Sequence, residues 1–216
     1  MARSVKRQSS RTYASPKRDE QAKATRWSIL EAARRLFVAN GYGATTLKAV
    51  AEEAGVAVQT VYAVFGNKRE LLKQATDVSI VGDDEPFAIS ERAAAVAVDR
   101  EKDPKKRARM SAAVTRGIVE RARAIAKVTR DAAAVDPEVA DLYRRGSAER
   151  RRGMEGAARG LAGPQKKLRV PIDDAAETLF VLYSPDVAIL LIDELGWSLD
   201  KYEEWLAMML ERTLLP

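Results

Sequence analysis

The fold of this chain is decided by residues 45–65, TTLKAVAEEAGVAVQTVYAVF, in which two short helical patterns flank a glycine. Apolar residues recur at offsets 0, 3, 4 and 7 from Leu47 and again at the same offsets from Val58, so each pattern gives one apolar helix face. Gly55 lies between them, where a tight turn needs a residue that tolerates a left-handed backbone. Two short helices joined by such a turn form a helix-turn-helix, whose second helix lies in the major groove of DNA.

The sequence predicts a further helix on each side of this unit. An apolar stripe over residues 29–37 gives a first helix, which Asn40-Gly41 ends. Thr45-Thr46 offers a hydroxyl group to cap the second helix. Residues 67–70, Asn-Lys-Arg-Glu, have the spacing of a capping box that opens a fourth helix. Lys68 then lies at a helix N-terminus, where charge and free amides favour a phosphate.

The remainder of the chain is expected to be helical as well. Ala, Arg, Glu and Leu dominate it, and the alternation typical of strands is missing. Asp103-Pro104, Asp136-Pro137 and Ser184-Pro185 each place a capping residue before a proline that suits the first helical position. We therefore predict about nine or ten helices and an all-α fold.

Composition argues against several classes of protein. None of the 216 residues is Cys or His, which removes disulfides, thiolate nucleophiles, zinc sites built on Cys or His, and Ser-His-Asp triads. No apolar run approaches the roughly 20 residues of a membrane-spanning helix, and no apolar stretch follows the charged N-terminus as in a secretory signal. The acidic pairs Asp173-Asp174 and Asp193-Glu194 are consecutive on helices, so their side chains diverge by about 100°. We expect no catalytic residues, no metal and no cofactor.

Positive charge is concentrated in the first third of the chain. Residues 1–75 hold 14 Lys and Arg against 6 Asp and Glu, although the net charge of the whole chain is only +6. Residues 1–24 show no apolar periodicity, and we expect them to form a flexible basic arm. The basic residues of this arm either follow DNA phosphates and enter a minor groove, or form an unbound solvated tail. They are Arg3, Lys6, Arg7, Arg11, Lys17 and Arg18.

The stretch quoted above resembles the DNA-binding domain of the TetR family. The likeness is carried by several motifs in the expected order, at residues 29–37, 41–42, 45–56, 60–65 and 68–72. A weaker likeness to the C-terminal region of many members covers residues 184–187, 196–198 and 202–206. The resemblance implies a helical homodimer that binds a palindromic operator and releases it when a small ligand enters the C-terminal domain. It also implies a helix-turn-helix domain at residues 25–75 and a helical ligand-binding and dimerisation domain at residues 76–216.

The recognition helix departs from the common pattern of that family. Ala57 and Val58 stand where many members carry Ser and a basic residue, so the helix lacks a hydroxyl cap and one phosphate contact is expected to be lost. Gln59 suits a bidentate pair with adenine, and the methyl groups of Thr60 and Ala63 suit contact with thymine. Tyr62 either contacts the DNA backbone or belongs to the core. The expected DNA-binding residues are Thr46, Lys48, Ala57, Val58, Gln59, Thr60, Tyr62, Ala63 and Lys68.

The C-terminal two-thirds of the chain contain broadly apolar helices that must bury more than one face. A two-fold interface across residues 172–214 would bury them, as palindromic DNA requires, although the inner layer of a monomer is the alternative. An arginine cluster over residues 144–152 indicates either an anionic partner or a solvated helix face. An apolar ligand pocket is expected between helices, or else its residues are ordinary core. The pocket candidates are Met110, Val114, Ile118, Tyr143, Met154 and Tyr183.

These observations together predict a transcriptional regulator. We expect a homodimeric repressor that binds double-stranded DNA through the helix at residues 58–65 and is released by a small-molecule effector. Such a protein is cytoplasmic, is associated with the nucleoid when bound to DNA, and has no membrane partner. The alternative is a sequence-tolerant nucleic-acid-binding protein held mainly by the basic arm, with steep salt dependence and little preference between sequences.

Overall fold

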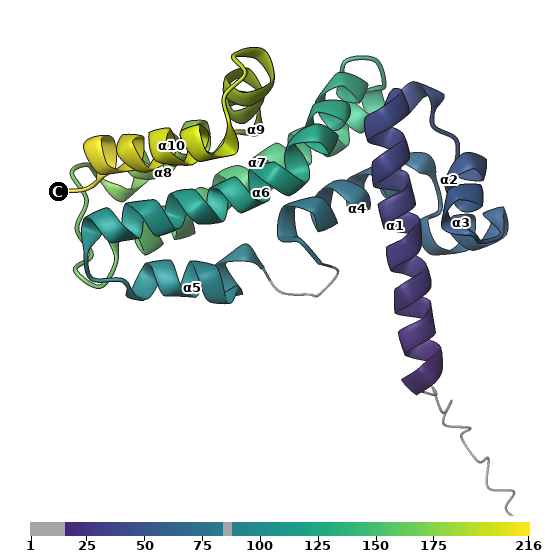
Figure 1. Cartoon of the computed structure of the whole chain (residues 1–216), viewed down its shortest axis with the longest axis horizontal. Helices are drawn as coiled ribbons and strands as arrows, with labels where there is room; N and C mark the ends of the chain where they lie inside the picture. The colour runs from purple at the N-terminus through teal and green to yellow at the C-terminus, as the bar shows by residue number, and fades with distance from the viewer. Residues whose placement is uncertain (1–15, 84–87) are drawn as a thin grey trace, which may run out of the picture.

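The computed structural model describes residues 16–83 and 88–216, and within these ranges every regular element is helical. This agrees with the predicted all-α fold. Figure 1 shows the long helices α6 and α7 side by side, with α1 to α4 packed at one end and α8 to α10 along one face. The elements are α1 (Pro16–Ala44), α2 (Leu47–Ala54), α3 (Val58–Phe65), α4 (Lys68–Val81), the 3-10 turn η1 (Ile89–Glu91), α5 (Ala93–Arg100), α6 (Pro104–Ala133), α7 (Pro137–Ala162), α8 (Ile172–Leu182), α9 (Pro185–Ala188), the π-helical segment η2 (Ile189–Glu194) and α10 (Leu199–Leu214).

The predicted helix boundaries are confirmed where a capping residue defines them. Gly41 has a φ of 76°, which ends the regular part of α1, and Gly55 has a φ of 69° after α2. Asp103, Asp136 and Ser184 each accept hydrogen bonds from backbone amides in the first turn of α6, α7 and α9, with a proline at the start of the helix. These short polar side chains replace hydrogen bonds that the first helical amides cannot make within the helix.

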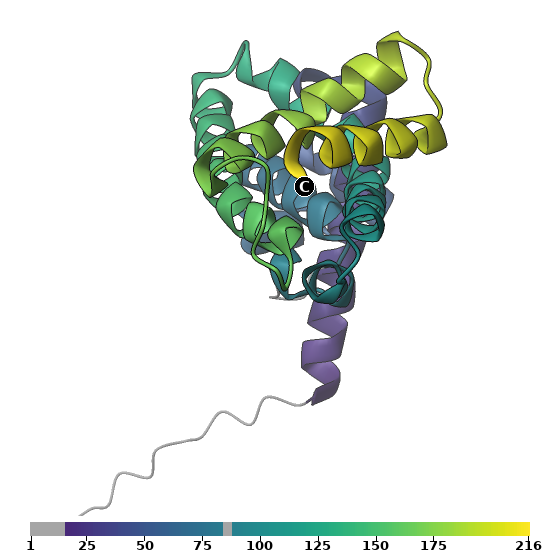
Figure 2. The same ribbon diagram turned by 90° about the vertical axis from the view of Figure 1, so that its left-hand side faces the viewer.

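The expected arm is partly helical. Residues 16–24, which the sequence assigned to the flexible basic arm, form the first turns of α1. Residues 18–24 are exposed, and this end of α1 stands clear of the other helices in both views (Figures 1 and 2). The absence of apolar periodicity correctly indicated an unpacked segment, but it does not prevent helix formation where Ala, Lys and Gln have high helix propensity. Residues 1–15 of the arm lie outside the described residues.

Two apolar cores lie at opposite ends of α6. The first core joins α1, α2, α3 and α4 and is completed by Ile125 and Ala132 of α6 and Val139 of α7. The second core joins the other end of α6, through Ala108, Ala112 and neighbours, to α7, α8, η2 and α10. The predicted boundary at residue 75 falls within α4, which continues to Val81. Residues 25–75 therefore do not form a core by themselves, because α6 and α7 complete it.

The α6–α7 end far from the helix-turn-helix is held by a buried arginine. Arg107 is 1% exposed, and its guanidinium donates to the carbonyl oxygens of Leu161 and Glu101, both at 2.6 Å. Gly163, with a φ of 64°, leaves room for it, since a Cβ atom there would lie 2.2 Å from the Arg107 Nη1 atom. The end of α7 is thus fixed to the start of α6.

Among the described residues no single helix is long and apolar enough to cross a membrane, although the bent pair Ile172–Leu182 and Pro185–Glu194 has the length and composition to do so.

Two tyrosines of the second core, the buried Tyr202 and the partly buried Tyr183, differ in their hydrogen bonding. The Tyr183 and Ser111 hydroxyl oxygens lie 2.7 Å apart, and burial raises the pKa of Tyr183 to about 12. Tyr202 is fully buried, and its hydroxyl has no hydrogen-bond partner among the described residues. A buried polar group without a partner costs free energy that a bonded one does not.

We therefore predict opposite responses to the same substitution. Tyr202→Phe is expected to leave the free energy of unfolding unchanged or to raise it by up to about 1 kcal/mol, because no hydrogen bond is lost. Tyr183→Phe is the matched control and is expected to lower it by about 1 kcal/mol. Urea denaturation followed by circular dichroism measures both. A loss of more than about 1 kcal/mol in Tyr202→Phe would mean that its hydroxyl has a partner.

Candidate nucleic-acid interface

The outward face of α3 is the centre of the candidate interface. Val61 and Phe65 are buried in the first core, whereas Gln59 and Ala63 are exposed on the other side of the helix. Tyr62 is 54% exposed, so the alternative that placed it in the core is wrong. Val58 is half-buried and packs against the first core, and Thr60 is half-buried as well. The predicted contact set on α3 is therefore brought together, with Val58 facing inward.

The turn before α3 sets how this helix is presented. The Gly55 N–H donates to the carbonyl oxygens of Ala51 and Glu52, and the Val56 N–H donates to Ala51 at 3.0 Å. These bonds satisfy carbonyl groups at the end of α2 and turn the chain directly into α3. Ala57 begins α3 without a side-chain cap, as the sequence predicted. The first amides of α3 are thus left without a capping side chain at the surface.

The start of α2 presents two more of the predicted residues. The Thr46 hydroxyl caps α2 by accepting the Ala49 N–H at 3.1 Å, which confirms the expected cap. The Lys48 side chain is 80% exposed, and its Nζ atom lies 3.8 Å from the Glu52 carboxylate. Such an exposed pair contributes little to stability and is easily exchanged for another anion. Lys48 therefore extends a positive charge beside α3.

Lys68 has a structural environment that the sequence did not indicate. Its ammonium donates to the carbonyl oxygens of Tyr42 at 2.9 Å, Thr45 at 3.1 Å and Gly43 at 3.4 Å, and it lies 4.3 Å from the centroid of the Tyr42 ring. An ammonium group has three donors, so all of them are engaged. A phosphate contact through Nζ would have to replace one of these bonds, and its role in DNA binding stays a prediction.

The capping box at the start of α4 is only half formed. The Asn67 side chain accepts the Glu70 N–H at 2.9 Å, as predicted. The reciprocal bond is absent, because the Asn67 N–H donates to Phe65 and the Glu70 carboxylate accepts from Gln74. The backbone N–H of Asn67 is thus used by the turn after α3 and is not available to the Glu70 carboxylate.

Contacts with α6 and α7 position this helix-turn-helix domain. The Tyr42 hydroxyl donates to the Asp136 carboxylate at 3.3 Å, and the same carboxylate caps α7. Burial and the nearby Asp136 charge raise the pKa of Tyr42 to about 12, so the hydroxyl is protonated at neutral pH and can donate. Arg69 forms an ion pair with Glu138 at 2.5 Å, in the first turn of α7. The start of α7 is thus bonded both to the C-terminal end of α1, through Tyr42, and to the start of α4, through Arg69.

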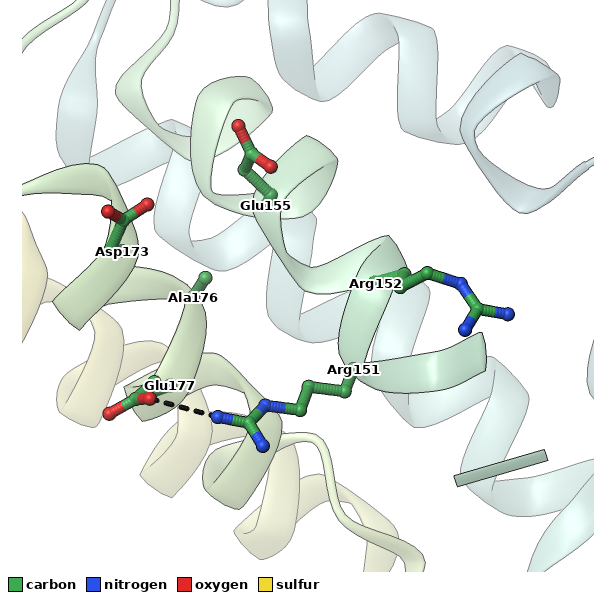
Figure 3. Close-up of a pocket in the computed structure, with 6 residues that line it drawn as sticks. All are labelled: Arg151, Arg152, Glu155, Asp173, Ala176 and Glu177. Atoms are coloured by element: carbon green, nitrogen blue, oxygen red, sulfur yellow. Dashed lines mark hydrogen bonds and ion pairs between the residues drawn. The ribbon is translucent and has the colours of Figure 1, made fainter. Parts of the chain in front are cut away.

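Two cavities lie on the described part of the helical domain, and neither coincides with the expected ligand pocket. One cavity of about 190 Å³ lies between α7 and α8, and Figure 3 shows Arg151 reaching Glu177 across it while Arg152 points away. A second, of about 440 Å³, lies between α6 and α10. Neither is lined by any of the six predicted residues; Met154 and Tyr183 pack against the second core, and all six are partly buried. The six positions stay a prediction as a ligand site.

The arginine cluster of α7 is largely paired with acids. Arg144 and Arg145 contact Asp141 at 3.3 and 2.8 Å, and Arg151 contacts Glu177 at 3.2 Å. Arg150 instead lies 3.7 Å above the Phe180 ring and donates to the Phe180 carbonyl oxygen at 2.6 Å. The solvated-face reading of this run therefore agrees better with these contacts than an anionic partner does.

The fold and this interface define a class of protein, the all-α helix-turn-helix proteins with a second helical domain. Residues 29–75 match the family model described as "Bacterial regulatory proteins, tetR family". Over these residues the N-terminal domain is therefore similar to the DNA-binding domain of the TetR family.

Individual proteins are similar to this chain over its N-terminal domain or in its fold. The HTH-type transcriptional regulator TtgR of Pseudomonas putida is 45% identical over 58 residues, which span 27% of this chain and 28% of TtgR. Among solved structures, NalD of Pseudomonas aeruginosa is similar with a TM-score of 0.65 and 21% identity, over 91% of this chain and 98% of NalD. The transcriptional regulator FadR of Bacillus subtilis, solved in complex with stearoyl-CoA, has a TM-score of 0.63 and 16% identity, over 85% of this chain and 96% of FadR. At these identities the two structures show a shared fold.

The contacts of Lys68 generate a prediction. Lys68→Met removes three hydrogen bonds to carbonyl oxygens and is expected to lower the free energy of unfolding by about 2 kcal/mol. It should also weaken binding to all DNA sequences alike, because the turn between α1 and α2 is no longer fixed to α4. Lys73→Met on the same helix is the control, since it loses only the exposed pair with Asp77 and is expected to cost about 0.5 kcal/mol. If Lys68→Met weakened DNA binding and its salt dependence without changing stability, Lys68 would be a direct phosphate contact.

Proposed function

We propose that this chain is a transcriptional regulator that binds an operator through α3 and is released by a small-molecule effector. The observation that carries the proposal is the exposed face of α3, held by a short turn on a helix-turn-helix that matches the TetR family. An exposed Tyr62 and a row of small and polar side chains suit a helix that enters a major groove. Repression is the direction of control we propose, and NalD, which shares the fold, is described as a repressor of a multidrug efflux pump.

A homodimer is proposed on the apolar surface of the C-terminal helices. Val181 of α8, Leu190 of η2 and Met208 of α10 are 58%, 48% and 37% exposed, and Leu195 beside them is 59% exposed. These residues all fall within the predicted dimer region, residues 172–214. Apolar side chains of this size are usually buried, and a two-fold interface would bury them while matching the symmetry of a palindromic operator. We place the protein in the cytoplasm, on the nucleoid when bound to DNA.

Control by an effector requires a mechanical link between the two domains. The hydrogen bond from Tyr42 to Asp136 and the ion pair from Arg69 to Glu138 both join the helix-turn-helix domain to the start of α7. A ligand that favours a different arrangement of α6 and α7 would therefore change the direction in which α3 points. Ligand binding releases DNA only by favouring such a second state. The chemistry of the effector is not specified by these contacts.

The proposal is tested by selecting bound sequences from random duplex DNA with the purified protein at near-physiological salt. We expect an enriched palindrome whose half-sites are spaced by about one helical turn of DNA, because two recognition helices of a dimer enter successive major grooves. Sequencing the bound fraction measures this. DNA binding without enrichment would favour the alternative, a sequence-tolerant binder held by its basic arm, and no binding would contradict both.

The arm gives a separate prediction. Deleting residues 1–18 removes six basic residues and is expected to weaken DNA binding and to flatten its dependence on salt, since each phosphate contact makes the slope of log K against log salt more negative by about 0.9. Fluorescence anisotropy over a salt series measures both quantities. The control replaces the same six side chains with glutamine in the full chain. Unchanged affinity and slope in both variants would mean that the arm is an unbound tail.

A further inference from the structure

The recognition helix carries no charged side chain. Residues 58–65, VQTVYAVF, include no Lys, Arg, Asp or Glu. In the major groove guanine is read mainly by Arg or Lys, cytosine by Glu or Asp, adenine by Asn or Gln, and the thymine methyl group by apolar contact. α3 therefore holds side chains suited to adenine and thymine, and lacks those best suited to guanine and cytosine.

The positions of these side chains make them available to a groove. At about 100° per residue, Gln59 and Ala63 lie at the centre of the face opposite the buried Val61 and Phe65. Val64 lies on one flank of that face and is 40% exposed. Val64 is not part of the first core, so its exposed methyl groups are available for contact with another molecule.

Several cations around α3 are bonded to other residues, and the guanidinium carbon of Arg26 lies 5.1 Å from the centroid of the Phe65 ring. The Lys68 ammonium is bonded to three carbonyl oxygens, and Arg69 is paired with Glu138. Arg35 is paired with Glu53 of α2 at 3.0 Å. Lys48 is the most exposed of these cations, with 80% of its side chain exposed against 52% for Arg35, and it lies at the start of α2 rather than on α3. A guanine contact is therefore not supplied to the centre of the α3 face by these neighbours.

We propose that α3 reads a run of A·T base pairs in each operator half-site. Gln59 pairs with an adenine, and the methyl groups of Thr60, Ala63 and Val64 contact thymine methyl groups. Val64 is a specificity-determining residue in this reading. The inference rests on the proposed function, because it requires that α3 enters the major groove.

The test removes thymine methyl groups without changing base pairing. The DNA probe is a duplex of the sequence enriched by selection, in which single thymines of one half-site are replaced by uracil. With the wild-type protein we expect a loss of affinity of about fourfold at each contacted thymine, at two or more positions, because each replacement removes one buried methyl group. Fluorescence anisotropy measures the dissociation constants.

A variant assigns one of these contacts to Val64. Val64→Ala is expected to bind the thymine duplex several-fold more weakly, and to lose no further affinity when the thymine it contacts is uracil. Val38→Ala is the matched control, because Val38 of α1 is 41% exposed and should leave every value unchanged. If Val64→Ala does not fold, Val64→Thr, which has almost the same shape, takes its place.

The outcomes separate this inference from the proposed function. An enriched operator with G·C pairs at the positions contacted by α3, or an A·T-rich operator indifferent to uracil, would overturn the inference and leave the regulator intact. Dissociation constants of Val64→Ala that equal those of Val38→Ala on the thymine and uracil duplexes would also overturn the inference and leave the regulator intact. The absence of any enriched sequence would overturn the proposed function itself.

Discussion

The structure depends on one helix being buried in two places. α6 has 30 residues and spans about 45 Å at about 1.5 Å per residue. Ile125 and Ala132 near its C-terminal end complete the core of the helix-turn-helix domain, and Ala108 and Ala112 near its start lie in the core of the C-terminal domain. Neither core is closed without it. A translation of α6 along its axis, or a rotation about it, must therefore change the side-chain packing of both cores, because close-packed interiors transmit strain.

The start of α7 extends this constraint to the helix-turn-helix. Asp136 both caps α7 and accepts the Tyr42 hydroxyl, while Lys68 fixes the backbone around Tyr42 to α4. The turn between α6 and α7 is thereby connected through hydrogen bonds to the turn between α1 and α2. α3 itself has few contacts of its own outside the first core, and this suits an element whose outer face is reserved for another molecule.

The sequence predicted what depends on local residues and missed what depends on distant ones. Caps at Thr46, Asn67 and Asp136 and the turn at Gly55 are set within four residues, and all were found. The hydrogen bonds of Lys68 were missed because its carbonyl partners lie 23 to 26 residues away in the sequence. The Tyr42–Asp136 bond spans 94 residues and left no local signal. Helix periodicity placed Tyr62 at an apolar offset and left open whether it belongs to the core, whereas the structure shows that it is exposed. The pocket residues could not be chosen because apolar spacing does not distinguish a cavity wall from packed core.

The neutral face of α3 has a consequence for how binding responds to ionic strength. Salt weakens protein–DNA complexes in proportion to the number of phosphates that the protein neutralises. A helix that reads bases without charge adds nothing to that number, so operator and non-operator complexes would share nearly the same counterion release. Their ratio of affinities would then stay almost constant as the salt concentration changes. Preference for the operator over competing genomic sites would be insensitive to changes in salt concentration, although the total occupancy of DNA would not be.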